Sequence, residues 1–262
     1  MFDSLKLFCS TFIKYMDHIF IINLAKDTKR YLSSTNGLKL QNISTDDYTR
    51  LDAVDGFKWC PYGPQIKNKI DTKHYSKLMR ETLYERKQLV NVGRSMKPGE
   101  IGIIQSIRKL FNHVLDETEY KNILVLEDDF KLCYNFNDKL AEVLKHAPGD
   151  ADLLYLGISS TNYKYGEFED IEENDYWEKP LGITYKSLIK KFKCKGGIFG
   201  AYGFIINRKG MKAFLKASMP MTRAVDVVLG RLSTIDNSIK TFSLKEKKHI
   251  ISYFKLGTTI QL

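Results

Sequence analysis

Cysteine is scarce in this chain and never closely spaced. The 262 residues include four cysteines, Cys9, Cys60, Cys133 and Cys194, which lie far apart and form no CxxC pair. This spacing indicates neither a zinc site nor a disulfide framework. We therefore expect free thiols in a reducing compartment.

Long apolar runs are also missing near the start of the chain. The apolar stretch Ile19–Ile22 is too short to cross a bilayer, and charged residues interrupt the segment before it. We find no apolar core or small-residue cleavage site typical of a secretory signal. These features predict no signal peptide and no transmembrane helix, and a location in the cytoplasm or at the cytosolic face of a membrane.

Acidic residues are fewer than basic ones, 31 against 41, so the formal net charge is +10. A basic chain favours an anionic partner, and phosphorylated small molecules, nucleic acid and lipid headgroups all qualify. The basic residues are scattered, and the lysine-rich run at 186–195 contains one aromatic residue, Phe192, with Tyr185 just before it. That is short of a stacking platform for nucleic acid, so we expect no specific nucleic-acid partner.

Buried strands alternating with helical segments predict an α/β fold with a mostly parallel central sheet flanked by helices. The expected strands are Ile19–Asn23, Ile123–Leu126, Leu153–Leu156 and Gly203–Ile206. A helix is expected to begin at Pro98 and Gly99, because apolar residues then recur at helical spacing, and a second is expected at about Lys209–Ser218. The acid-rich segment at about 163–178 and the lysine-rich run after it are interpreted as surface insertions on a single domain.

The most informative segment is a short apolar run that ends in three carboxylates, Glu127, Asp128 and Asp129. Charges at the end of a buried strand need partners. Because side chains alternate along a strand, Glu127 and Asp129 are expected on one face and Asp128 on the other. A divalent cation, Mn²⁺ or Mg²⁺, would relieve their repulsion and bind substrate phosphates. The alternative is that the triplet caps a following helix or pairs with lysines.

Six short blocks follow one another in an informative order. They are Ile19-Phe-Ile-Ile-Asn-Leu24 with Arg30; Leu51-Asp-Ala-Val-Asp-Gly56; Lys97-Pro-Gly-Glu-Ile-Gly102 with Ser106; Ile123-Leu-Val-Leu-Glu-Asp-Asp129; Asp152-Leu-Leu-Tyr-Leu-Gly157; and Ala201-Tyr-Gly-Phe-Ile-Ile-Asn-Arg-Lys-Gly210, with Asp226 downstream. In these blocks the chain resembles glycosyltransferase family 25, the lipooligosaccharide and collagen-type galactosyltransferases. The part after about Gly230 resembles the family least.

The resemblance implies a GT-A-like fold over one domain at 1–262, with a donor-binding half at about 15–160 and an acceptor-side half and C-terminal segment at about 161–262. It implies a metal-dependent, inverting transfer of a hexose, galactose first, from a UDP-sugar to a glycan or glycoconjugate. Carried onto this chain, Asp129 is the metal ligand. Apart from the resemblance, His249 in the C-terminal segment is a candidate additional ligand, and the alternative is a surface histidine after Lys247 and Lys248. The donor-binding residues are then Asn23, Leu24, Arg30, Asp55, Gly56, Glu127 and Asp128.

Inverting transfer needs a base to accept the proton of the acceptor hydroxyl, and a positioned carboxylate is the usual choice. Asp226 is the candidate, because an acid among apolar residues should be partly desolvated. Glu100 is the rival, although the start of a helix also explains an acid there. The family usually has a Ser-His pair after its Gly-Glu-Ile-Gly block, whereas here Ser106 is followed by Ile107.

Two other functions remain open on the residues alone. One is a nucleic-acid-binding protein, which would bind in a strongly salt-dependent way. The other is a glycosyltransferase-like scaffold without turnover, for which the missing histidine is the only sign. A homodimer and a peripheral membrane position are both compatible with the sequence.

Overall fold

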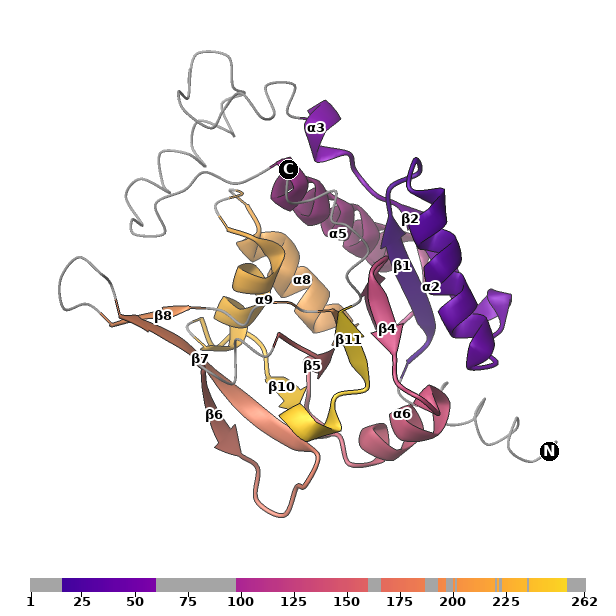
Figure 1. Ribbon diagram of the computed structural model, residues 1–262. Helices are drawn as coiled ribbons and strands as arrows, with labels where there is room; N and C mark the ends of the chain where they lie inside the picture. Colours follow the sequence, from indigo (N-terminus) through magenta and orange to yellow (C-terminus); the bar gives the residue numbers. More distant parts are fainter. Residues whose placement is uncertain are drawn as a thin grey trace, which may run out of the picture.

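A computed structural model describes residues 16–59, 98–159, 166–186, 193–196, 200, 202–219, 221, 223–234 and 236–253. Its centre is a nine-stranded sheet in the order β2-β1-β3-β9-β5-β10-β7-β6, with β8 paired to β7 (Figure 1). The strands are β1 (His18–Asn23), β2 (Tyr48–Asp52), β3 (Asn122–Glu127), β5 (Leu153–Gly157), β6 (Gly166–Asp170), β7 (Trp177–Lys186), β8 (Lys193–Gly196), β9 (Gly203–Asn207) and β10 (Thr241–Leu244). The four predicted strands are confirmed to within a residue at each end.

The sheet is mixed, and most of its strands run in one direction. β1 pairs in parallel with β2 and β3, and β5 pairs in parallel with β10. β9 runs against both of its neighbours, β3 and β5, and β7 runs against β10, β6 and β8. The mostly parallel sheet is therefore confirmed in strand direction, with β9 and β7 reversed.

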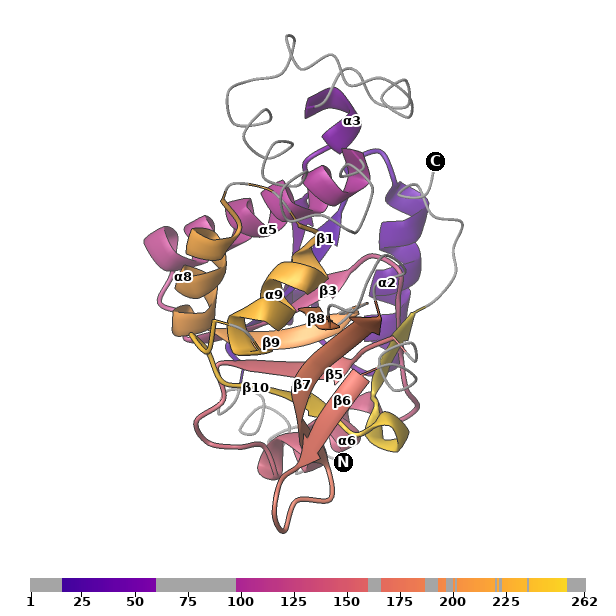
Figure 2. The same cartoon turned by 90° about the vertical axis from the view of Figure 1, so that its left-hand side faces the viewer.

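One face of the sheet is covered by three helices, α5 (Pro98–Glu117), α8 (Arg208–Ala217) and α9 (Val225–Thr234) (Figure 2). α5 begins at the predicted Pro98, and its buried face includes Ile104, Ile107 and Phe111. α8 begins after Asn207, whose side chain accepts a hydrogen bond from the Gly210 amide at 2.8 Å, as N-capping residues do. Both predicted helices are thus confirmed.

The opposite face is covered by α2 (Thr28–Leu40), α6 (Phe136–Lys145) and a small antiparallel sheet of β4 (Phe130–Leu132) and β11 (Ile251–Tyr253). A short helix α3 (Gly56–Trp59) and two 3₁₀ turns (Thr45–Asp47 and Glu246–Lys248) complete the description. Alternate residues of β3 supply both cores, because Ile123 and Val125 face α5 while Leu124 and Leu126 face the other layer. Within the ranges that the structure describes, no helix is long and apolar enough to cross a bilayer.

The acid-rich segment differs from its interpretation as a plain surface loop. Its described part forms β6, a turn and the start of β7, which pair as an antiparallel hairpin. Trp177 anchors this hairpin, since its ring is fully buried and its Nε1 donates to the Val143 carbonyl at 2.8 Å. Three of the acidic residues, Glu167, Glu169 and Asp170, therefore lie on a strand that extends the main sheet, and Glu172, Glu173 and Asp175 lie in the turn. Tyr163, Tyr165 and most of the lysine-rich run are outside the described residues.

Candidate active site

The ends of β1 and β3 bring the predicted donor residues together. The two strands are parallel neighbours, and Ile22 lies opposite Glu127. Parallel strands end at the same edge of a sheet, where α/β folds usually bind ligands. The loop after Asn23 and the acidic triplet therefore border the same space.

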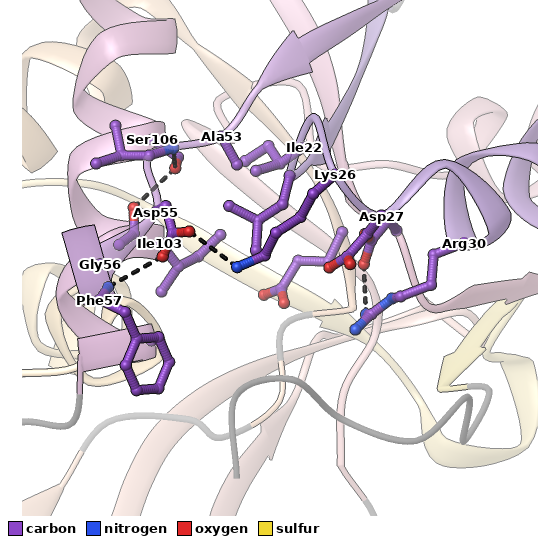
Figure 3. A pocket seen from close by; sticks show the side chains of 16 residues that line it. Ile22, Lys26, Asp27, Arg30, Ala53, Asp55, Gly56, Phe57, Ile103 and Ser106 are labelled. Atoms are coloured by element: carbon purple, nitrogen blue, oxygen red, sulfur yellow. Dashed lines mark hydrogen bonds and ion pairs between the residues drawn. The ribbon is translucent and has the colours of Figure 1, made fainter. Parts of the chain in front are cut away.

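A pocket opens at this edge and holds about 590 Å³ of space, part of it open to solvent (Figure 3). Its wall comes from the end of β1, the loop between β2 and α3, the first turns of α5 and the end of β3. Six of the seven predicted donor residues line it: Leu24, Arg30, Asp55, Gly56, Glu127 and Asp128.

Arg30 on the first turn of α2 is the cation paired with the triplet. Its guanidinium contacts Asp128 and lies 3.0 Å from Asp129 Oδ2, and all three side chains are largely buried. Burial raises the pKa of Asp129 to about 6, and the Arg30 charge opposes that rise. Burial also raises the pKa of Asp128, against hydrogen bonds from Asn23 and the charge of Arg30. Arg30 thus compensates two carboxylates that would otherwise repel each other.

This arrangement corrects two expectations about the triplet. Strand β3 ends at Glu127, and Asp128 and Asp129 form a turn into β4. Side chains therefore stop alternating between the two faces of the sheet after Glu127. Asp128 and Asp129 both contact Arg30, although the sequence had predicted them on opposite faces. The alternative that the triplet caps a following helix is also wrong, because the next element is a strand.

Asn23 holds the triplet from behind the pocket. Its buried amide Nδ2 donates to Asp128 Oδ2 at 2.5 Å and to the Asp27 carbonyl at 3.1 Å. Its Oδ1 accepts from Arg50 Nη2 at 2.5 Å. Asn23 is not one of the residues that line the pocket. Its hydrogen bonds instead position Asp128, which does line it.

Arg50 is a residue of the site that the sequence reasoning missed. Besides Asn23, its Nη2 reaches the carbonyls of Leu24 and Ala25, both at 3.2 Å, and its guanidinium lies 4.7 Å from the centre of the Tyr31 ring. Arg50 therefore fixes the loop after β1. The parallel pairing of Arg50 with Ile21 puts it within reach, and that pairing is not visible in the sequence.

Close packing explains two residues of the sequence blocks. A Cβ added to Gly56 would lie 1.8 Å from the Pro98 carbonyl oxygen, so only glycine lets α3 approach α5. Ser106 Oγ accepts from the Val54 amide at 2.8 Å and donates to the Gly102 carbonyl at 2.7 Å. Gly56 and Ser106 thus shape the pocket wall through packing and hydrogen bonding.

At the pocket mouth, Lys26 Nζ pairs with Asp55 Oδ2 at 2.8 Å (Figure 3). The hydrogen bond from Lys26 lowers the pKa of Asp55, and the Phe57 amide donates to the other carboxylate oxygen at 3.1 Å. Asp55 is therefore an ionised carboxylate with fixed orientation.

Glu127 of the triplet interacts with a carboxylate from a helix, Asp226 at the start of α9, which in turn interacts with Glu100 at the start of α5. Burial raises the pKa of Glu127 to about 8, and the charges of Asp129, Asp226 and Asp128 add to the rise. Burial also raises the pKa of Asp226, with a contribution from Glu100, while amides of Gly200 (3.2 Å) and Val227 (2.8 Å) donate to its oxygens and oppose the shift. The structure thus brings Asp226 near the triplet, and Glu100 near Asp226.

His249 does not join this group. It precedes β11, whose other end, Tyr253, pairs with Phe130 next to Asp129. His249 Nε2 lies 3.1 Å from the Leu244 carbonyl oxygen, and burial lowers the pKa of the ring to about 4. The structure therefore does not bring His249 beside Asp129, because the β4–β11 ladder lies between them. Tyr253, at the other end of β11, is the residue of this segment that lies near Asp129.

The donor chemistry of the triplet suits a hard divalent cation that binds mainly through phosphate. Among the described residues, no group of three or more His, Cys, Asp or Glu side chains is arranged to hold a metal ion. Mg²⁺ and Mn²⁺ commonly bind one or two carboxylates and complete their coordination with water and substrate phosphates. Asp129 and its neighbours fit that mode and do not fit a closed protein site.

Comparison with known proteins agrees with the sequence blocks. The family model described as glycosyltransferase family 25 (LPS biosynthesis protein) matches residues 16–229. No curated protein matches the chain in sequence. Among solved structures, the chain is similar to A197 from STIV, with 12% identity, coverage of 88% of this chain and 83% of that one, and a TM-score of 0.39. It is also similar to HddC from Yersinia pseudotuberculosis, with 13% identity, coverage of 87% and 89%, and a TM-score of 0.37.

Proposed function

The chain belongs to glycosyltransferase family 25, and from this premise we propose that it is a metal-dependent, inverting hexosyltransferase with a UDP-sugar donor and a glycan or glycoconjugate acceptor. Galactose is the donor hexose that the family resemblance favours. The observation that carries the proposal is the pocket at the ends of β1 and β3, which is lined by Asp128, the carboxylate that both Arg30 and Asn23 hold in place. Arg30 also pairs with Asp129, the next residue.

The pocket has an apolar part suited to a nucleoside and an ionic end suited to a diphosphate. Ala53, Val54, Phe57 and Ile103 line the apolar part, and Asp55 offers a fixed acceptor for a base or ribose donor group. Glu127 and Asp128 line the other end, and Asp129 follows them in the turn after β3. Asp129 would hold Mn²⁺ or Mg²⁺, which, when bound, supplies positive charge that stabilises the departing diphosphate. Arg30 keeps both carboxylates oriented and compensated before the donor arrives.

Asp226 is the proposed base. The two backbone amides that donate to its carboxylate fix its direction at the start of α9. Its raised pKa makes it a better proton acceptor than an exposed aspartate, provided that it is ionised at the working pH. It would take the proton of the acceptor hydroxyl as that oxygen attacks the anomeric carbon.

The test is calorimetric donor binding and release of UDP from a panel of UDP-sugars, with Mn²⁺ or with chelator, for the wild type and Asp129→Asn. Asp116→Asn, an exposed aspartate on α5, is the matched control. We expect binding and turnover that require the cation and Asp129 and are unchanged by Asp116→Asn. Donor binding without transfer would identify an inactive scaffold. If no UDP-sugar of the panel binds in a metal-dependent way, the UDP-sugar proposal is refuted.

A further inference from the structure

Two tyrosines from distant parts of the chain border the acidic residues. Tyr202 directly precedes β9, one position beyond the pairing of Gly203 with Leu126, and so lies opposite Glu127. Tyr253 ends β11 in register with Phe130, which follows Asp129. Figure 1 shows β11 beside β4. The two rings stack with centroids 5.6 Å apart and planes inclined by 29°. Neither tyrosine is needed for the nucleoside pocket, which they do not line.

Two strand-end glycines allow β11 to reach this place. A Cβ added to Gly157 would lie 1.9 Å from the Ile251 carbonyl oxygen, and one added to Gly203 would lie 2.5 Å from Ile251 Cδ1. The Ile250 amide also donates to the Leu156 carbonyl at 3.1 Å. β11 therefore passes directly over the ends of β5 and β9, and this close approach fixes Tyr253 two residues later.

Both tyrosines are partly exposed and electrically coupled to the carboxylates. Burial raises the pKa of Tyr202, and Asp129, Glu127 and Asp226 raise it further, while a hydrogen bond with Ser159 opposes the rise. Burial and Asp129 likewise raise the pKa of Tyr253. The two hydroxyl groups are therefore neutral near pH 7 and can donate to an oxygen, while the rings offer apolar surface.

The strand order places the nucleoside pocket and the two tyrosines on opposite sides of β3. The pocket lies over β2, β1 and the end of β3, while the tyrosines lie on the far side of β3, beside β9 and β11. Strands in a sheet are about 4.8 Å apart, so the step from β1 to β9 is roughly 10 Å. A donor with its nucleoside in the pocket and its diphosphate at Asp129 would place its third part, the hexose, at the tyrosines.

We propose that Tyr202 and Tyr253 form the wall against which the hexose ring of the donor packs. The inference rests on the proposed function, because it takes the diphosphate position from Asp128 and Asp129. A hexose has an apolar face of C–H groups and a rim of hydroxyls. The tyrosine rings match the face, and the tyrosine hydroxyls with the nearby carboxylates match the rim. The pair thus contributes affinity for the sugar and none for the nucleotide.

The test compares the affinities of UDP and of UDP-galactose for the 262-residue chain in Mn²⁺, measured by calorimetry. The variants are Tyr253→Leu and Tyr202→Leu, which remove a ring, and Tyr253→Phe, which keeps the ring. Tyr134→Leu is the matched control, because Tyr134 is 83% exposed in the loop after β4. We expect each leucine variant to bind UDP-galactose about threefold to tenfold more weakly with unchanged UDP affinity. Tyr253→Phe should lose less than Tyr253→Leu, because it keeps the ring and removes only the hydroxyl, and Tyr134→Leu should retain the wild-type ratio.

The two proposals fail in different ways. If the leucine variants bind both ligands as the wild type does, or lose both equally, the tyrosines do not hold the donor hexose, and UDP binding that depends on Asp129 leaves the proposed function standing. If the wild type binds neither ligand, the proposed function is wrong, and so is the proposal that Tyr202 and Tyr253 pack against the donor hexose. Unchanged UDP affinity also reports that each variant is folded.

Discussion

The Arg30 guanidinium lies 3.0 Å from Asp129 Oδ2 and at the same time contacts Asp128, so one buried cation serves two buried carboxylates. We predict that Arg30→Gln lowers the free energy of unfolding by roughly 3 to 5 kcal/mol, because it leaves buried charge without a partner. Urea denaturation at pH 7.5 measures the loss.

The same variant tests whether the carboxylates accept a divalent ion. Mn²⁺ should raise the melting temperature of Arg30→Gln more than that of the wild type, because an ion replaces the missing charge. Lys26→Gln, which removes an exposed cation at the pocket mouth, is the control and should show no such gain. Equal effects of Mn²⁺ on all three proteins would show that the ion does not bind where Arg30 acts.

Gly157 and Gly149 form a matched pair for the crossing of β11. A Cβ at Gly157 would collide with the Ile251 carbonyl oxygen, whereas a Cβ at Gly149 would meet nothing within 4 Å. We predict that Gly157→Ala displaces β11, lowers the melting temperature by several degrees and weakens binding of UDP-sugar. Gly149→Ala should leave both unchanged. Thermal unfolding followed by circular dichroism gives the first measurement, and calorimetry gives the second.

A normal melting temperature for Gly157→Ala would mean that β11 does not lie against β5 in solution. That result would also remove the reason for placing Tyr253 beside Asp129.

Kinetic measurements on variants can decide whether Asp226 or Glu100 is the catalytic base. We predict that Asp226→Asn lowers kcat by about 10² to 10⁴-fold with little change in donor affinity, the usual range for loss of a general base. Glu100→Gln should have a smaller effect, since Glu100 acts on Asp226 through its charge. Asp236→Asn, an exposed aspartate beyond α9, is the control. Initial rates of transfer and donor titrations measure the two quantities, and a larger loss in Glu100→Gln would reverse the assignment.

Much of the fold could be predicted because it follows from local patterns. The apolar runs at β1, β3, β5 and β9 and the helical spacing of Ile104, Ile107 and Phe111 require no knowledge of distant contacts. The direction of each strand was harder to predict from the sequence. A run such as Gly203–Asn207 is apolar whether it runs with its neighbours or against them, so the reversal of β9 could not be read from it.

The acidic triplet could be identified from the sequence. Its partners could not, because they depend on the pairing of strands that lie far apart in the sequence. Asn23 meets Asp128, and Arg50 meets Asn23, only because β1 lies between β2 and β3 in a fixed register. Tyr253 meets Asp129 through a crossing that two glycines permit. The sequence pointed to His249, four residues earlier, and not to Tyr253, because the direction of β11 and its pairing with β4 are not visible in the sequence.

Glu127 provides a pH-dependent test of the acidic cluster. Its pKa rises from 4.5 to about 8 in the folded protein, chiefly through burial and then through Asp129 and Asp226. A raised carboxyl pKa stabilises the fold at pH below 4.5, and that contribution is lost as pH rises through about 8. Glu127→Gln stays neutral, so we predict melting temperatures close to wild type at pH 5 and a few degrees higher than wild type at pH 8.5. Glu172→Gln, an exposed residue in the β6–β7 turn, should show no such divergence. If the wild type and Glu127→Gln differ equally at both pH values, Glu127 titrates outside this interval and the three carboxylates are not coupled as the structure indicates.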